Sequence, residues 1–128
     1  MNDAPCAALA TGVIADGVYI FPMRVYYDDT DAVGIVYHAN YLKYAERART
    51  EFLRHIGIDH IAILAEDDAA FAVRHMAIDY LKPARLDERL EVHTRLTEVK
   101  GASVRATQTV RRRGDDLVRM DLRLACMN

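Results

Sequence analysis

Hydrophobic residues recur along this chain at two spacings, and each spacing predicts a different element. Residues 19–27 alternate with period two, which is the pattern of a β-strand. Between about Asn40 and Ile56, apolar side chains recur every three or four positions, at Tyr41, Ala45, Ala48, Phe52 and Ile56. That spacing places them on one face of a helix roughly 25 Å long. Gly57 follows directly and is suited to ending the helix.

Period-two patterns return in the second half of the chain. Residues 71–80 carry apolar side chains on both faces, which predicts a strand that is covered on both sides. Three alternating segments follow, at residues 90–96, 104–110 and 118–126. The turns between them are short, and short connections favour antiparallel neighbours. Residues 58–66 predict a short helical segment before these strands.

The order of these elements is strand, long helix, then four strands. One apolar helix face cannot cover five strands unless the sheet curls around it, so the order predicts a two-layer α+β fold with a five-stranded antiparallel sheet. The chain has 128 residues, which fits one hydrophobic core. We expect residues 1–18 to form an N-terminal tail and residues 19–128 to form a single domain.

Charge and composition exclude several classes of function. Seventeen basic and nineteen acidic residues give a net charge of −2, so no general positive field is available for nucleic acid or an anionic membrane. Residues 1–18 contain no Lys or Arg, and no apolar run approaches membrane-spanning length. We therefore expect a cytoplasmic protein without stable membrane insertion. The five histidines and two cysteines lack metal-ligand spacing, which predicts neither a metal nor a cofactor.

The segment between the first strand and the helix is the most informative part of the chain. It reads YYDDTDAVGIVYHANY at residues 26–41, and its first half is dense in turn-forming residues. Taken singly, its members have structural interpretations. Asp31 would be a turn or capping residue, His38 a hydrogen-bonded structural histidine, and Tyr27 a strand residue that faces the core. Asn40 would cap the helix or orient the turn.

Taken together, these residues resemble the bacterial acyl-CoA thioesterases associated with the Tol–Pal envelope system, relatives of 4-hydroxybenzoyl-CoA thioesterase. The shared pattern is D-x-D-x-x-G-x-V-Y-H-x-N-Y entering a helix, and the resemblance extends through residues 78–85 to cover about residues 19–126. It implies a hot-dog fold, in which a curled antiparallel sheet wraps one long helix. It also implies a homodimer or homotetramer with active sites at the subunit interface.

The resemblance further implies the reaction and its residues. Thioester hydrolysis needs a carboxylate that attacks the carbonyl or deprotonates water, and a donor for the developing oxyanion. Asp31 matches the family's carboxylate, the backbone N–H of His38 matches the oxyanion donor, and Tyr27 matches a position that lines the site. The His38 side chain is an alternative contact for substrate or water. Acyl carrier protein could replace coenzyme A as the carrier. If coenzyme A is the carrier, Lys82, Arg85 or Arg111–Arg113 could bind its phosphates.

Two other functions compete with this one. A hot-dog hydratase would act on the same class of thioester, but it carries His and Asp on the helix in a pattern that is missing here. A non-catalytic hot-dog module that binds acyl thioesters or envelope partners would be expected to lack the carboxylate, so the presence of Asp31 argues against it. The acyl group itself stays open between aromatic, short aliphatic and long chains.

Overall fold

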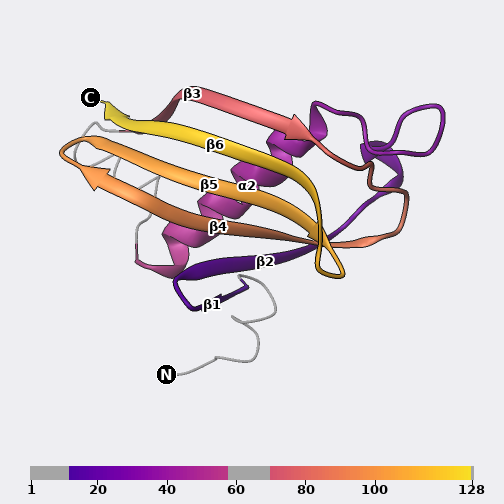
Figure 1. The fold of residues 1–128 in the computed structure, drawn as a ribbon, viewed down its shortest axis with the longest axis horizontal. Helices are drawn as coiled ribbons and strands as arrows, with labels where there is room; N and C mark the ends of the chain where they lie inside the picture. The colour runs from indigo at the N-terminus through magenta and orange to yellow at the C-terminus, as the bar shows by residue number, and fades with distance from the viewer. Residues whose placement is uncertain (1–11, 58–69, 128) are drawn as a thin grey trace.

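The computed structural model describes residues 12–57 and 70–127 of the chain. Its elements are β1 (Val13–Ala15), β2 (Val18–Arg24), the 3-10 helix η1 (Tyr27–Asp29), α2 (Asn40–His55), β3 (Ala70–Tyr80), β4 (Arg89–Lys100), β5 (Ser103–Arg112) and β6 (Asp115–Met127). The strands form one sheet in the order β1-β2-β4-β5-β6-β3, and all neighbours are antiparallel. α2 crosses one face of this sheet (Figure 1). The predicted α+β hot-dog arrangement is confirmed.

The predicted number of five strands is wrong, because the sheet has six. The additional strand, β1, lies within the segment that we expected to be a tail, and it pairs with the start of β2. Asp16 and Gly17 join the two strands, both with positive φ (53° and 77°), as a tight hairpin turn requires. β1 has only three residues, all exposed, so it leaves no hydrophobic period to detect.

The core lies between α2 and the concave face of the sheet. Ala45 and Ala48 are fully buried on the helix, and their small side chains allow the helix to lie close to the strands. The sheet contributes alternate residues, as predicted for the last three strands, namely Leu90, Val92, Val110, Val118, Met120 and Leu122. The hydrophobic residues whose spacing predicted the helix and these strands therefore pack into one shared core.

A polar network is buried inside this apolar layer. The side chain of Gln108 on β5 is 0% exposed. Its Nε2 donates to the Ala45 carbonyl oxygen of α2 at 3.0 Å and to Thr94 Oγ1 of β4 at 2.9 Å. Its Oε1 accepts a hydrogen bond from Arg49 Nη1 at 2.9 Å. Because both ends of the amide are bonded, this polar group joins the helix to two strands without leaving a buried atom unpaired.

The environment of β3 differs from the prediction that residues 71–80 form a strand covered on both faces. This strand lies at an edge of the sheet and pairs only with β6 among the described strands, and Val73 and Tyr80 are 44% and 47% exposed. It is therefore half-exposed, not covered on both sides. A register shift between Val73 and His75 interrupts the pairing with β6. Such a bulge moves the following side chains to the other face, which explains why the sequence pattern looked apolar on both faces.

The ends of the elements around α2 position the loops. Gly57 has a φ of +95° and donates its N–H to Arg54 O at 3.1 Å, so it ends the helix as predicted. β2 ends at Arg24, earlier than the predicted strand, and the 3-10 helix η1 follows. The short helical segment predicted at residues 58–66 lies outside the described residues.

Candidate active site

The loop between β2 and α2 carries the predicted site, and it is closed by its own hydrogen bonds. The Asp31 N–H donates to Ile35 O at 2.9 Å, and the Gly34 N–H donates to Asp31 O at 3.1 Å. Gly34 has a φ of +81°, which glycine adopts without the strain that a side chain would add. The loop lies at the end of the sheet where α2 begins (Figure 1, purple). The turn around Asp31 is therefore a fixed structure, although it contains no strand or helix.

Asp31 presents a carboxylate with one oxygen held and one available. Its side chain is exposed, and Oδ1 accepts the backbone N–H of Val33 at 2.9 Å. Within residues 12–57 and 70–127, no protein group donates to Oδ2. The turn thus fixes the direction of the side chain while leaving an oxygen free to act on a ligand or water molecule.

The neighbouring Asp29 has a structural role instead. Its Oδ2 accepts the N–H of Tyr26 at 2.8 Å, and its backbone oxygen accepts the N–H of Tyr37 at 3.0 Å and Asn40 Nδ2 at 2.9 Å. Asn40 is the first residue of α2, and the N-cap position belongs to Ala39. Of the two roles left open for Asn40, the structure shows the second, since its side chain orients the turn and does not cap the helix.

His38 lies just before the first turn of α2. No protein group in the described part of the chain accepts a hydrogen bond from its backbone N–H. The amino-terminal end of a helix carries partial positive charge, which favours an anion at this point. A free N–H at such a position can stabilise an oxyanion without first breaking another hydrogen bond. The His38 ring is exposed and forms no hydrogen bond within the described residues, so the interpretation as a hydrogen-bonded structural histidine is wrong.

Tyr80 contacts His38, and the sequence prediction did not include it. Its hydroxyl donates to the His38 carbonyl oxygen at 3.2 Å, and its ring meets the imidazole edge-on with centroids 6.1 Å apart. The Tyr37 ring also contacts the His38 imidazole, in a tilted arrangement with ring centroids 4.5 Å apart. Tyr80 belongs to the stretch at residues 78–85 that contributed to the resemblance, and this was the only indication in the sequence analysis that Tyr80 could belong to the site.

Tyr27 lies in η1 and is 82% exposed. Its interpretation as a core-facing strand residue is wrong, because β2 ends before it. Its carbonyl oxygen accepts both the N–H of Thr30 at 3.2 Å and Thr30 Oγ1 at 2.7 Å. The side chain is free to meet a ligand beside the loop that carries Asp31, and its role in lining the site stays a prediction.

The segment Pro83–Glu88, which we call the strap, holds the turn around Asp31 from the other side. The Val36 N–H donates to Ala84 O at 2.9 Å, and the Leu86 N–H donates to Gly34 O at 3.3 Å. Ala84 is fully buried and donates its own N–H to the Tyr41 hydroxyl of α2 at 3.0 Å. The turn is thereby fixed to both the helix and the strap.

An ion pair secures the strap to β5. Glu88 Oε1 accepts the Arg85 N–H at 2.7 Å and Arg112 Nη1 at 2.9 Å. The same Arg112 nitrogen lies 3.2 Å from Pro83 O. Both side chains of the pair are mostly buried, at 24% and 29% exposure for Arg112 and Glu88. This pair links the sheet to the strap, which in turn contacts the turn around Asp31.

Comparison with known proteins identifies the family. Residues 33–119 match the thioesterase superfamily. The chain belongs to the thioesterase superfamily. The predicted relationship is confirmed, since the thioesterase is 45% identical over 113 residues to the acyl-CoA thioesterase YbgC of Haemophilus influenzae, covering 88% of this chain and 83% of that protein.

Two further relatives agree. The acyl-CoA thioester hydrolase YbgC of Escherichia coli O157:H7 is 50% identical over 93 residues, which is 73% of this chain and 69% of that protein. The crystal structure of a probable thioesterase from Bartonella henselae superimposes with a TM-score of 0.83 and 36% identity, covering 87% of this chain and 92% of that one. The hot-dog fold and the assignment as a thioesterase thus rest on both sequence and structure.

Two buried tyrosines border the site of the thioesterase. Burial raises the pKa of Tyr41 above its ordinary value of 10.0. Burial also raises the pKa of Tyr44, and the nearby carboxylate charge of Asp29 acts in the same direction. The Tyr44 hydroxyl forms no hydrogen bond of standard geometry within the described residues. Both phenols remain protonated at neutral pH, so neither can serve as the base.

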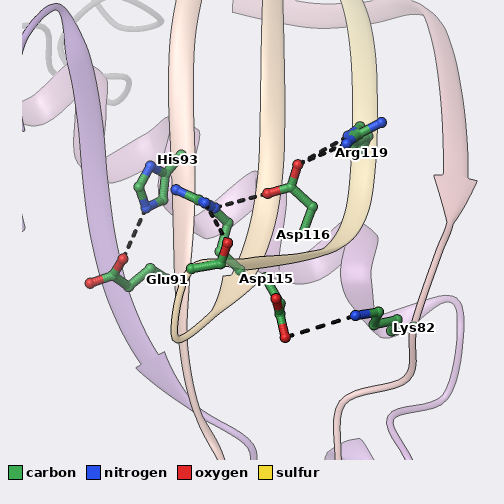
Figure 2. A network of polar contacts seen from close by, with 8 residues as sticks. Lys82, Glu91, His93, Asp115, Asp116 and Arg119 are labelled. Carbon is green, nitrogen blue, oxygen red and sulfur yellow. Dashed lines mark hydrogen bonds and ion pairs between the residues drawn. The ribbon is translucent and has the colours of Figure 1, made fainter.

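The arginines considered for phosphate binding are mostly engaged with the protein. Arg111 Nε donates to Asp116 Oδ1 at 2.9 Å, and Arg119 holds the other oxygen of Asp116 at 3.0 Å. Figure 2 shows the Asp116–Arg119 contact, with the ion pair between Lys82 and Asp115 (3.8 Å) beside it. These residues belong to the hairpin between β5 and β6 and the loop facing it. The structure therefore gives Lys82, Arg111 and Arg112 protein partners, and a role with phosphates for any of the five cations stays a prediction.

Neither metal-binding clusters nor membrane-spanning helices occur in the part of the thioesterase that the structure describes. There, no three His, Cys, Asp or Glu side chains gather closely enough to hold a metal ion. Over the same residues, no helix combines the length and apolar character needed to cross a bilayer.

Proposed function

We propose that this thioesterase hydrolyses an acyl-CoA to the free carboxylic acid and coenzyme A, with Asp31 as nucleophile or general base. The observation that carries the proposal is the loop itself. It presents a carboxylate with a free oxygen, and it leads to a free backbone N–H at the start of a helix. These are the two groups that thioester hydrolysis requires. The names of the YbgC relatives support acyl-CoA as the substrate.

The reaction proceeds through a tetrahedral intermediate in either role of Asp31. As a general base, Asp31 takes a proton from water while the water oxygen bonds to the thioester carbon. As a nucleophile, its oxygen bonds to the thioester carbon, departure of the thiolate leaves an acyl anhydride, and water then opens the anhydride to the free acid and the Asp31 carboxylate. In both cases the carbonyl oxygen gains negative charge and accepts the His38 N–H. The carbon–sulfur bond breaks when this intermediate collapses, and the thiolate leaves readily because thiols are much stronger acids than alcohols; a Cys thiol, for comparison, has a pKa of about 8.5.

Other side chains around the loop complete the proposed site. We propose that Tyr27, which is 82% exposed, lines the site and that the exposed His38 imidazole is a second contact for substrate or water. We propose that the reaction needs no metal ion, because carboxylate and backbone N–H together supply the base and the oxyanion donor. Treatment with a chelator should therefore leave turnover unchanged. Loss of activity that zinc restores would contradict this part of the proposal.

We also propose that the enzyme is a homodimer or homotetramer with the site near the subunit interface. The position of β3 supports this, since it is the last strand of the sheet and pairs with β6 alone among the described strands. An edge strand can extend a sheet by pairing with a second copy. Sedimentation at micromolar concentration tests the proposal, and a fully active monomer would refute it. The cytoplasmic location and the Tol–Pal link stay predictions from the resemblance.

A thiol-release assay tests the activity directly. Purified enzyme is given acyl-CoA substrates of increasing chain length and an aromatic acyl-CoA, and the released thiol is measured. We expect turnover with at least one of these substrates, and the profile will define the acyl group. An acyl carrier protein loaded with the preferred acyl group tests the alternative carrier. Binding of acyl-CoA without thiol release would instead support the non-catalytic binding module.

A further inference from the structure

Tyr80 contacts His38 at two points, although 42 residues separate them in the chain. The hydroxyl donates to the His38 carbonyl oxygen at 3.2 Å, and the phenol ring meets the imidazole edge-on at 89°. Tyr80 is the last residue of β3, so this contact ties the loop before α2 to the edge of the sheet. The two contacts hold the backbone and the side chain of His38 at the same time.

We propose that Tyr80 is a positioning residue that holds His38 so that its backbone N–H faces the thioester oxygen. The proposal rests on the function proposed above. A group that stabilises a transition state must be held within about 0.5 Å and roughly 10–20° of the productive geometry. His38 lies before the first residue of α2, and its N–H has no acceptor among the described residues. The Asn40 N–H donates to the Tyr37 carbonyl oxygen at 2.8 Å and so holds the peptide plane that carries the His38 N–H. The contacts of Tyr80 with the His38 carbonyl and ring hold the following peptide plane and the side chain, and both supports are needed to fix the direction of the N–H.

Tyr80 can impose this orientation because it is itself fixed. Its backbone pairs with Val118 of β6, and its ring packs against the ring of Tyr41 with centroids 5.9 Å apart. Tyr41 is buried, and its hydroxyl accepts the N–H of Ala84 in the strap. Tyr80 is thus supported by the sheet, the helix and the strap together. A contact with a single mobile side chain would not provide this precision.

The position of Tyr80 also connects the proposed site to β3, the last strand of the sheet. β3 is the strand that a second copy would pair with in the proposed dimer. Pairing would restrict the movement of β3 and therefore of the residue that holds His38. One residue would then link assembly to the geometry of the oxyanion donor.

The test compares Tyr80→Phe, which keeps the ring and removes the hydroxyl, with Tyr26→Phe as a matched control. Tyr26 is also on the surface, at 64% exposure, and makes no ring contact with His38. We expect Tyr80→Phe to lower kcat roughly 3- to 10-fold, the effect of losing one neutral hydrogen bond, with little change in KM. Tyr80→Leu, which also removes the ring contact, should lower kcat further. Tyr26→Phe should retain native kcat.

A spectroscopic signal separates positioning from a general effect on the fold. Enzyme labelled with carbonyl-¹³C histidine reports the His38 carbonyl, which is assigned with a His38→Gln variant. We expect this resonance to shift in Tyr80→Phe and not in Tyr26→Phe, because only the first loses a hydrogen bond to that oxygen.

The outcomes are distinct. An unchanged kcat or an unchanged His38 carbonyl resonance in Tyr80→Phe would overturn the proposal. If Tyr80→Leu fails to fold, Tyr80→Phe decides alone. If the native enzyme releases no thiol from any acyl-CoA, the proposed function fails, and the positioning role in that reaction fails with it. A changed carbonyl resonance would then show only that the hydrogen bond exists.

Discussion

Replacing Asp31 by asparagine tests the centre of the proposed mechanism. The amide is nearly isosteric, and its Oδ1 can still accept the Val33 N–H that Asp31 accepts at 2.9 Å. The turn should therefore survive, and because Asp31 is exposed the free energy of unfolding should change by no more than about 0.5 kcal/mol. An amide cannot attack a thioester or take a proton from water. The substitution thus removes the chemistry and leaves the local structure.

We expect Asp31→Asn to lower kcat by at least about 100-fold, the scale for a positioned acid–base or nucleophilic group. This corresponds to at least about 2.7 kcal/mol of lost transition-state stabilisation. The Kd for acyl-CoA should change little or fall, because a negative charge near the thioester is removed. Steady-state thiol release, thermal melting and sedimentation on the same preparation give kcat, stability and assembly.

The matched control is Asp28→Asn, three residues earlier in the same loop. Asp28 is exposed, and its carboxylate has no hydrogen-bond partner among the described residues, so the change removes equal charge without touching the proposed base. We expect native turnover from this variant. Near-native turnover in Asp31→Asn would refute the mechanism. Equal losses in the two variants would assign the effect to loop charge and not to Asp31.

Three further predictions concern the framework of the site. Glu88→Gln weakens the mostly buried ion pair with Arg112, and we expect it to lower the free energy of unfolding by about 1–2 kcal/mol in denaturant titrations. It should also lower kcat, because the strap supports the turn around Asp31. An unchanged kcat would show that the strap does not affect the geometry of that turn. Burial alone would raise the pKa of Asp116, but Arg119 and Arg111 together hold it below 3.8, so its charge stabilises the fold above that pH. The destabilisation by Asp116→Asn should therefore be present at pH 7 and shrink as the pH falls below about 4; a deficit independent of pH would contradict this. Burial, aided by the charge of Glu51, raises the pKa of Tyr19 from 10.0 to about 12, and its hydroxyl has no hydrogen-bond partner among the described residues. Tyr19→Phe should raise the free energy of unfolding by about 1 kcal/mol at pH 7, because it removes a buried hydroxyl without a partner. The difference should grow as the pH rises through 10 to 12, because the unfolded wild-type chain then loses the Tyr19 proton more easily than the folded one and the wild-type protein becomes less stable. A lower Tm for the variant would show that the hydroxyl is hydrogen-bonded.

The sequence predicted those parts of the fold that one periodic signal dominates. The helix from Asn40 and the strands around Val92, Val110 and Met120 bury one face each, so their spacing reports the core. β3 was misjudged because a bulge at Val73 and His75 resets its period, and such a shift leaves no mark in composition. β1 was missed because three exposed residues cannot show a period.

The candidate site divides in the same way. Asp31 and His38 were predicted because turn chemistry and the family pattern lie in one continuous stretch. Tyr80 was missed because its contact with His38 depends on where the edge strand ends relative to the helix, which is a long-range property. The strap has the same origin, since the pairing of Ala84 with Val36 joins segments that only the fold brings together. Local patterns thus indicated the groups that we propose to react, whereas the residues that hold these groups could be found only in the structure.

The buried amide of Gln108 has a mechanical consequence. An apolar helix resting on an apolar sheet could slide along its axis by a turn, about 5.4 Å, and still find hydrophobic contacts. The hydrogen bond from Gln108 to the Ala45 carbonyl opposes such a slide, because the slide would break it together with the bond from Arg49 of the same helix, which would leave the buried Gln108 Oε1 without a partner. Ala45 lies five residues, about 8 Å, beyond the start of α2. This bond therefore fixes the position of α2 along its axis and with it the distance between the first turn of the helix and Asp31. A substitution at Gln108 would thus change the geometry of the proposed site without altering any residue of the loop.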